Sequence, residues 1–194
     1  MTRGTRGSGS CESPQRDRPP AGLAPLGPGV RPMVADPVTC AGADTSTTTV
    51  AITHLHEDGT LHWINTIRPT GNSALERAVQ LIDMLPTPAY WDANGTTRLL
   101  IERQFQARGA VSGAHENAGI AWLLFASAWR AGVEVGWVRP QEWRAGLGWP
   151  RMRAAEAKRM AVTTAIDATG VATLSTDEAE AYWIAHTAWQ ERPR

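Results

Sequence analysis

The amino-acid sequence predicts an α/β protein in which helices flank a mixed sheet of five strands. Three consecutive strand patterns with short connections open the ordered part, and short connections favour antiparallel pairing. Two more strand patterns then alternate with helical patterns, as expected for parallel strands joined by helices. The chain has 194 residues, of which 42% are hydrophobic, so one domain with a substantial core is expected.

The N-terminal segment, residues 1–36, is rich in Gly, Pro, Ser and Arg and has no hydrophobic period. We expect a disordered tail in front of a single ordered domain at residues 37–190, with Met33 as a second candidate for the start of translation. The segment lacks the apolar stretch of a secretory signal, and the apolar runs of the chain are too short to cross a membrane. Because Cys11 and Cys40 form no disulfide framework, we predict a cytoplasmic protein with free thiols.

The first three strands are predicted at residues 38–44, 47–55 and 61–68. The first contains small residues and ends at Asp44, and the second is β-branched with alternating polarity. Asp58-Gly59 between the second strand and the third is a strong hairpin signal. The three strands are therefore expected to pair in an antiparallel fashion.

A helix is predicted from a cap at Asn72 or Ser73 to Met84, before the first of two prolines that end it. The residues expected on its apolar, core-facing side are Leu75, Val79, Leu81 and Ile82. The continuous apolar run at residues 99–101 then predicts a parallel strand buried on both faces.

The remaining predicted elements are helices at 115–130, 152–168 and from Ser175 onward, a strand at 133–138, and a basic, Gly-rich loop at 140–150. Three antiparallel strands followed by alternating strands and helices is the order of the ribonuclease-H-like nuclease fold. In this fold the first and fourth strands lie side by side.

Four carboxylates stand where this fold would bring them together. Asp44 ends the first strand and Glu102 ends the fourth. Asp177 and Glu180 are three residues apart and share one face of the last helix. Glu178 has a different predicted role, because Ser175 and Glu178 have the spacing of a capping box.

Such a cluster is unfavourable unless cations bind it, and carboxylate oxygens suit Mg²⁺ or Mn²⁺. Two such ions can activate a water and stabilise the leaving oxygen of a phosphodiester. The acids therefore predict metal-dependent phosphodiester hydrolysis. An ordinary strand-end residue is an equal alternative for Asp44 alone, whereas the charge of Glu102 after three buried apolar residues is harder to explain structurally.

The formal net charge is zero, which argues mildly against a nucleic-acid partner, but residues 139–159 contain six cations and two anions, a local net charge of +4. We predict that this segment contacts DNA phosphates. A solvated basic face explains the charges alone equally well. The cations are Arg139, Arg144, Arg151, Arg153, Lys158 and Arg159.

Five motifs in this order resemble the RuvC-like Holliday-junction resolvases, particularly their divergent phage members. They are A-D-T-S-T-T-T on the first strand, the apolar strand L-L-I-E-R-Q-F, the helix start H-E-N-A-G-I-A-W, the segment V-R-P-Q-E-W-R-A-G-L-G-W with the following A-A-E-A-K, and the final D-E-A-E-A-Y-W-I-A. Together they cover about residues 38–189. The chain departs from the family in a shorter turn after Asp44 and in Glu180, which stands where the family has Asp.

The resemblance implies that two Mg²⁺ or Mn²⁺ ions bind at Asp44, Glu102, Asp177 and Glu180. It implies that Lys158 is a catalytic residue near the scissile phosphate and that Phe105 wedges into the DNA junction, with a core position as the alternative for Phe105. It further implies a homodimer whose two sites cut opposite strands of a four-way junction by paired symmetric nicks.

Two groups of side chains have other interpretations. His54, His56 and His62 cluster on the hairpin, but no Cys or acid completes a zinc site, so we assign them to the solvent face of the sheet. Trp122, Leu123, Leu124 and Trp129 lie near one face of a helix. They form either a dimer seam or, slightly favoured, part of the core.

The function also has alternatives. A ribonuclease-H-like nuclease for flaps, other branched DNA or RNA–DNA hybrids would use the same acids, because substrate choice lies in loops. An ATPase of the actin and sugar-kinase type needs two such domains, and the chain has room for one. A binding module without catalytic activity is disfavoured by the four acids.

Overall fold

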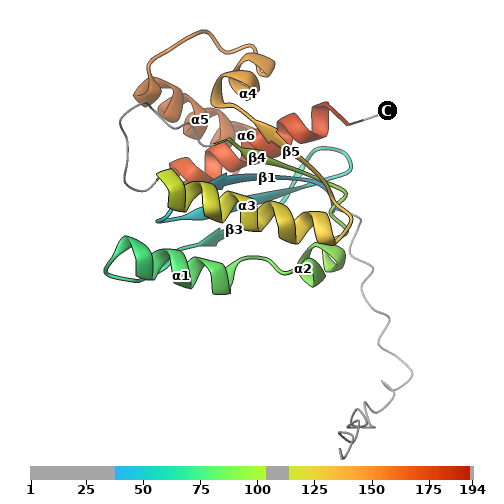
Figure 1. Ribbon diagram of the computed structural model, residues 1–194. Helices are drawn as coiled ribbons and strands as arrows, with labels where there is room; N and C mark the ends of the chain where they lie inside the picture. The colour runs from blue at the N-terminus through green and yellow to red at the C-terminus, as the bar shows by residue number, and fades with distance from the viewer. Residues whose placement is uncertain (1–37, 104–113, 193–194) are drawn as a thin grey trace, which may run out of the picture. The chain divides into compact units, whose positions relative to one another are not determined.

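The computed structural model describes residues 38–103 and 114–192 of the chain. Strands β1 (Val38–Thr45), β2 (Val50–His56) and β3 (Leu61–Ile67) pair in an antiparallel fashion, and β4 (Arg98–Glu102) is parallel to both β1 and β5 (Glu134–Val138). Together they form one sheet in the order β3-β2-β1-β4-β5 (Figure 1). The predicted mixed sheet of five strands, with the first strand beside the fourth, is confirmed.

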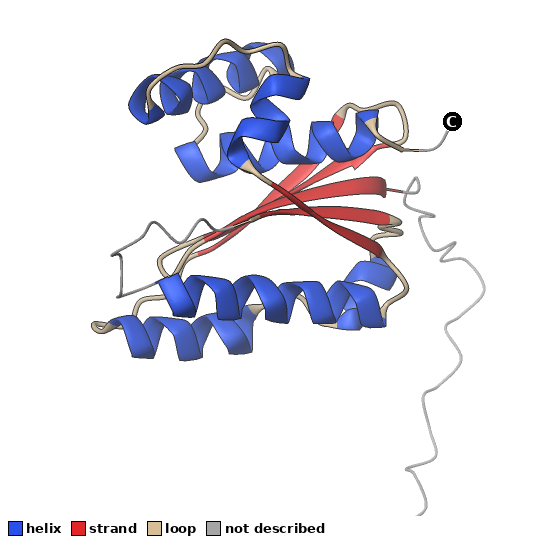
Figure 2. Ribbon diagram, turned by 45° about the horizontal axis from the view of Figure 1, so that its top comes forward, coloured by secondary structure: helices blue, strands red, loops and turns tan. Residues whose placement is uncertain are grey.

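Helices cover both faces of the sheet (Figure 2). On one face, α1 (Ala74–Met84), α2 (Pro88–Ala93) and α3 (Ala114–Arg130) bury residues such as Trp91 and Leu124. On the other, α4 (Pro140–Gly146), α5 (Ala154–Thr169) and α6 (Thr176–Gln190) bury residues such as Trp143 and Ile184. None of the helices in the described part of the chain has the length and apolarity needed to cross a lipid bilayer.

The backbones of β1 and α6 approach each other more closely than any side chain would allow. A Cβ atom built on Gly42 would lie 2.1 Å from the backbone nitrogen of Ala185 and 2.6 Å from the carbonyl oxygen of Ala181. These distances are far below van der Waals contact, so only glycine fits at this point of β1. The glycine of the first strand is therefore explained by the helix that lies on it.

The apolar side predicted for α1 is wrong for three of its four residues. Leu81 is buried, but Leu75 is 72% exposed, and Val79 and Ile82 are each about half exposed. α1 packs against α3, and this contact covers only a narrow side of the helix. Leu75, Val79, Ile82 and Met84 are exposed to solvent.

The slightly favoured core position is also wrong for Trp122, Leu123 and Trp129 of α3. Leu124 is buried, but Trp122, Leu123 and Trp129 are exposed, Trp129 by 66% of its surface. Residues three or four apart share a face of a helix, and Leu124 continues the buried face set by Ile120 and Ala128. Trp129 therefore projects into solvent, whereas Trp122 is exposed on one side and packs on the other against Trp137 of β5, with ring centroids 5.0 Å apart.

Two short helices begin at prolines that had other expected roles. Pro140 opens the segment where a loop is predicted, and Pro88 is one of the two prolines expected to end the preceding helix. α4 replaces part of the expected loop, with Pro140 as its first residue and a hydrogen bond from the Arg139 backbone N–H to Glu142 Oε2 at 2.7 Å. α2 likewise begins at Pro88. Proline is favourable at the first helical position, because the N–H that it lacks would have no partner within the helix there.

The three histidines of the hairpin occupy different environments. His54 is fully buried, with Nε2 2.9 Å from the Tyr90 hydroxyl, and its ring stacks on Trp63. The expected solvent-facing position is therefore wrong for His54, because α2 carries Tyr90 over this part of the sheet. His62 is exposed as expected, and its Nδ1 lies 3.0 Å from Nε2 of His56.

Candidate metal centre

β1 and β4 end side by side at one edge of the sheet. They pair in parallel with Ala43 opposite Ile101, so the register brings the next residues, Asp44 and Glu102, to matching positions. Side chains alternate along a strand, and Leu100, two residues before Glu102, packs in the core beneath α6. Asp44 and Glu102 are thus on the face of the sheet that α6 covers.

The start of α6 is fixed by a capping box. The Ser175 hydroxyl accepts a hydrogen bond from the Glu178 N–H at 3.3 Å, and Glu178 Oε2 accepts one from the Ser175 N–H at 2.8 Å. Glu178 Oε1 also accepts a hydrogen bond from the Thr66 hydroxyl at 2.7 Å and lies 3.5 Å from Arg68. Glu178 therefore serves the helix start and its contact with β3, as its predicted capping role requires.

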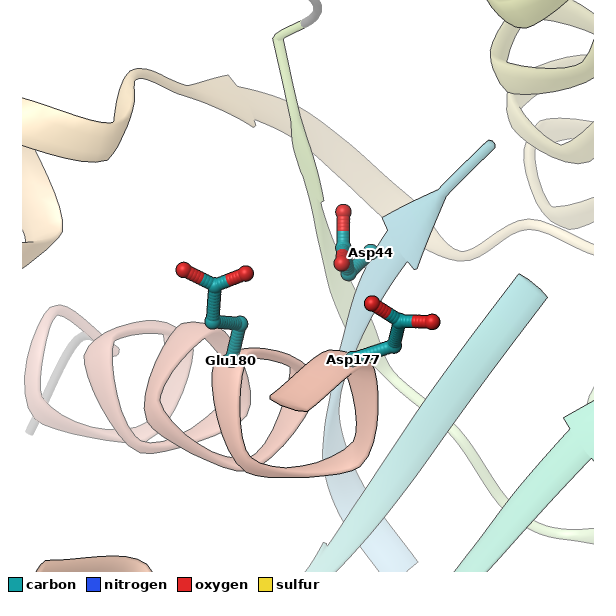
Figure 3. A group of neighbouring side chains, drawn as sticks. All are labelled: Asp44, Asp177 and Glu180. Carbon is teal, nitrogen blue, oxygen red and sulfur yellow. The ribbon is translucent and has the colours of Figure 1, made fainter. Parts of the chain in front are cut away.

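Three carboxylates meet where α6 crosses the end of β1 (Figure 3). Asp44, Asp177 and Glu180 each offer an oxygen, and these oxygens lie within 4.8 Å of one another. Among the acids, histidines and cysteines of the described residues, these three carboxylates are the group that lies close enough together to hold a metal ion. Glu102 lies outside this trio but close enough for its charge to act on Asp44.

Burial and mutual repulsion make it costly to ionise these acids together. Burial, followed by the charges of Glu102, Glu180 and Asp177, raises the pKa of Asp44 well above its ordinary value. Burial also raises the pKa values of Glu102 and Glu180. A divalent cation would offset both the lost hydration and the repulsion, and a donor set made only of carboxylate oxygens fits Mg²⁺ or Mn²⁺.

Two consecutive residues of α4 hold acids of this site. The indole N–H of Trp143 donates a hydrogen bond to Glu102 Oε2 at 3.0 Å. Arg144 donates one from Nη2 to Glu180 Oε1 at 2.9 Å. The sequence patterns do not single out Trp143, one of nine tryptophans, and they assign Arg144 to DNA contacts. The structure places the Arg144 guanidinium at the acid cluster itself.

The other predicted DNA-contacting residues that the structure describes have exposed side chains, namely Arg139, Arg151, Arg153, Lys158 and Arg159. Burial dominates the raised pKa values of Asp44, Glu102 and Glu180, and the charge of Lys158 lowers all three. Lys158 is thus electrostatically coupled to the acids. Phe105 lies outside the described residues.

Comparisons with known proteins bear on the fold. No protein-family model and no curated protein sequence matches this chain. Among solved structures, it is similar to Thermus thermophilus RuvC in complex with a Holliday junction substrate, with 18% sequence identity and a TM-score of 0.59 over 76% of this chain and 91% of that one. A second RuvC structure from Thermus thermophilus matches with 17% identity and a TM-score of 0.56 over 76% of this chain and 92% of that one. This chain therefore has the fold of the RuvC resolvases, which is the ribonuclease-H-like fold that its sequence predicts.

Proposed function

We propose that this protein is a metal-dependent, structure-selective endodeoxyribonuclease that resolves four-way DNA junctions. The observation that carries the proposal is the meeting of Asp44, Asp177 and Glu180, with Glu102 beside them, at one edge of a sheet with the RuvC fold. One RuvC structure with this fold is described in complex with a Holliday junction substrate. Metal ions bound at the acid cluster would supply the chemistry that cutting such a substrate requires.

Two Mg²⁺ or Mn²⁺ ions bound here would activate the attacking water and stabilise the leaving oxygen of the phosphodiester. Asp44, Asp177 and Glu180 would hold them, with Glu102 as the fourth carboxylate. All four acids stand on a strand or a helix, which positions ligands more accurately than a loop. Because Trp143 binds one oxygen of Glu102, the other oxygen is left for a metal ion.

The basic residues between β5 and the end of α5 would bind the DNA backbone. We assign phosphate contacts to Arg139, Arg144, Arg151, Arg153, Lys158 and Arg159. Lys158 would lie nearest the scissile phosphate, because its charge already acts on three of the four acids. Phosphate contacts release counterions, so binding should weaken steeply as salt is added. Phe105 is kept as the proposed wedge.

An exposed apolar surface supports the proposed homodimer. α3 exposes Trp122, Leu123 and Trp129, and α1, which packs against α3, exposes Leu75, Val79, Ile82 and Met84. Apolar side chains gathered in this number on neighbouring helices mark an interaction site more often than a free surface. We propose that a second copy of the chain covers them, so that two acid clusters can make paired symmetric nicks.

The test is cleavage of labelled four-way junctions, flaps, RNA–DNA hybrids and linear duplexes in Mg²⁺ or Mn²⁺. Asp177→Asn should reduce junction cleavage by at least about 100-fold, because it removes a ligand charge. Glu178→Gln is the matched control, since it changes the neighbouring acid, which serves the helix start. It should keep cleavage and cost less than about 1 kcal/mol of stability, because glutamine keeps the capping box and only the charge near the helix start and its pair with Arg68 are lost.

Equal cleavage by the wild type and by both Asp177→Asn and Glu102→Gln would refute the assigned site. Cleavage of flaps or hybrids without cleavage of junctions would favour the other ribonuclease-H-like nucleases as the function. Light scattering tests the dimer separately. Trp129→Glu should convert a dimer to a monomer, whereas Arg130→Glu, an exposed change at the end of the same helix, should not.

A further inference from the structure

The positively charged side chain of Arg144 forms a salt bridge with Glu180, one of the proposed metal ligands. Its Nη2 lies 2.9 Å from Glu180 Oε1, and the pair is shielded from water, with the Glu180 side chain 6% exposed and the Arg144 side chain 22% exposed. Among the salt bridges within residues 38–103 and 114–192, this is the one that involves an acid of the trio. In this structure the guanidinium therefore neutralises an acid that a metal ion would neutralise.

The guanidinium is held incompletely in this position. Its Nε is buried and has no hydrogen-bond partner within the described residues, which leaves a desolvated donor unsatisfied. Its contact with Glu180 uses a single N–H, whereas the strongest arginine–carboxylate pairs use two. The guanidinium also lies over the Trp143 ring, whose centroid is 4.8 Å from Arg144 Cζ, and its charge acts on the carboxylate of Glu102. Arg144 thus makes only part of the contacts that its side chain could make.

The side chain also has space into which it can turn. A cavity of about 430 Å³ lies beside it, lined by Gln141, Arg144, Trp149, Arg151 and Met152, among others. Trp143 is fully buried and would keep its place while the neighbouring arginine changes rotamer. Release of Glu180 therefore needs no movement of α4.

We propose that Arg144 is a displaceable substitute for a metal ion, which neutralises Glu180 in the metal-free protein and leaves it when a divalent ion binds. This proposal rests on the proposed metal site. The first ion has to compete with the guanidinium, so the wild-type protein binds metal more weakly than the acids alone would. In return, the metal-free protein avoids an uncompensated charge at a buried glutamate. Trp143, which is neutral, keeps its hydrogen bond to Glu102 in both states.

Mn²⁺ titration followed by electron paramagnetic resonance, without DNA, tests the proposal. Arg144→Met keeps an unbranched side chain but removes the charge and the hydrogen bond to Glu180. It should bind Mn²⁺ about tenfold more tightly than the wild type, because a hydrogen bond to a charged group contributes free energy of that order. The metal-free variant should melt at a lower temperature than the metal-free wild type. Arg144→Lys, which keeps the charge, should bind Mn²⁺ more weakly than Arg144→Met.

Arg68→Met is the matched control. It removes an arginine whose Nη2 lies 3.5 Å from Oε1 of Glu178, which is on α6 like Glu180 but is not a proposed metal ligand. Its Mn²⁺ affinity should equal that of the wild type. If Arg144→Met is folded and binds Mn²⁺ no more tightly than the wild type, the substitute role is overturned. If Arg144→Met fails to fold, Arg144→Gln takes its place and must bind Mn²⁺ more tightly than Arg144→Lys. A wild-type protein that binds no Mn²⁺ would instead overturn the metal site and the proposed function.

Discussion

Gly42→Ala tests whether the seat of α6 on β1 sets the geometry of the acid cluster. The added Cβ would lie 2.1 Å from the Ala185 nitrogen and 2.7 Å from Ala185 Cα. Ordinary contacts of this kind are about 3.5 Å or longer, and the obstructing atoms are backbone, so no rotamer change can relieve them. α6 must therefore move away from β1 by roughly 1 Å, or β1 must bend by a similar amount.

The expected cost follows from that displacement. Overpacking of a core costs about 1–3 kcal/mol, and a backbone obstruction belongs at the upper end of that range. For a domain of this size, 3 kcal/mol lowers the melting temperature by roughly 6–12 °C. Asp177 and Glu180 would move with α6 while Asp44 stays with β1, and a misplacement of about 1 Å can cost about 100-fold in catalysis.

Circular dichroism measures the melting temperature, and Mn²⁺ affinity and junction cleavage report on the site. Gly119→Ala is the control, because a Cβ built on this glycine of α3 meets nothing within 4 Å. In a helix that change should stabilise the protein by up to about 1 kcal/mol. A Gly42→Ala protein with wild-type stability, Mn²⁺ affinity and cleavage would show that the close approach of α6 does not control the site.

Three further outcomes are expected. Trp143→Phe removes the hydrogen bond to Glu102 and should lower Mn²⁺ affinity by about 10–100-fold; unchanged affinity would mean that the indole serves packing alone. Because burial raises the folded-state pKa values of Asp44, Glu102 and Glu180, these acids hold more protons in the folded protein than in the unfolded one above about pH 4, and their contribution to the metal-free stability should fall as the pH rises. The gain in melting temperature on adding Mn²⁺ should therefore be larger at about pH 8 than at about pH 5, and an equal gain at both would contradict this account. Burial lowers the pKa of His54 from 6.5 to about 3, so its neutral form stabilises the fold above its unfolded pKa, and that stability is lost as the pH falls. Urea unfolding at pH 7 and pH 5 should show the wild type losing about 2 kcal/mol more than His54→Phe, and parallel losses would remove His54 as the cause.

Parts of the site depend on residues that are close together in the sequence, and these could be predicted. The capping box of Ser175 and Glu178 is a local pattern, and the structure shows both of its hydrogen bonds. The spacing of Asp177 and Glu180 puts both on one face of α6 for the same reason. An apolar run that ends at Glu102 also marks a buried strand without reference to any other part of the chain.

The contacts of α4 with the acids could not be predicted in this way. Trp143 reaches Glu102 across 41 positions of sequence, and Arg144 reaches Glu180 across 36. Neither residue type has a preference for such a partner that a local pattern could reveal. In addition, the sequence predicts a loop at residues 140–150, whereas Trp143 and Arg144 lie on helix α4.

By itself, the sequence determined the order of the strands and of the four longer helices, the five-stranded mixed sheet and the positions of the acids within their elements, because periodicity, caps and turn signals act over a few residues. The short helices α2 and α4 were not among these. Only the tertiary structure decided which side chains are covered and which are paired. Leu75 is apolar yet exposed, and His54 is polar yet buried, since burial depends on whether another element lies above the residue. The sequence shows a glycine at position 42 of β1. Only the folded structure shows why it is needed there, because the backbone of α6 lies directly against it.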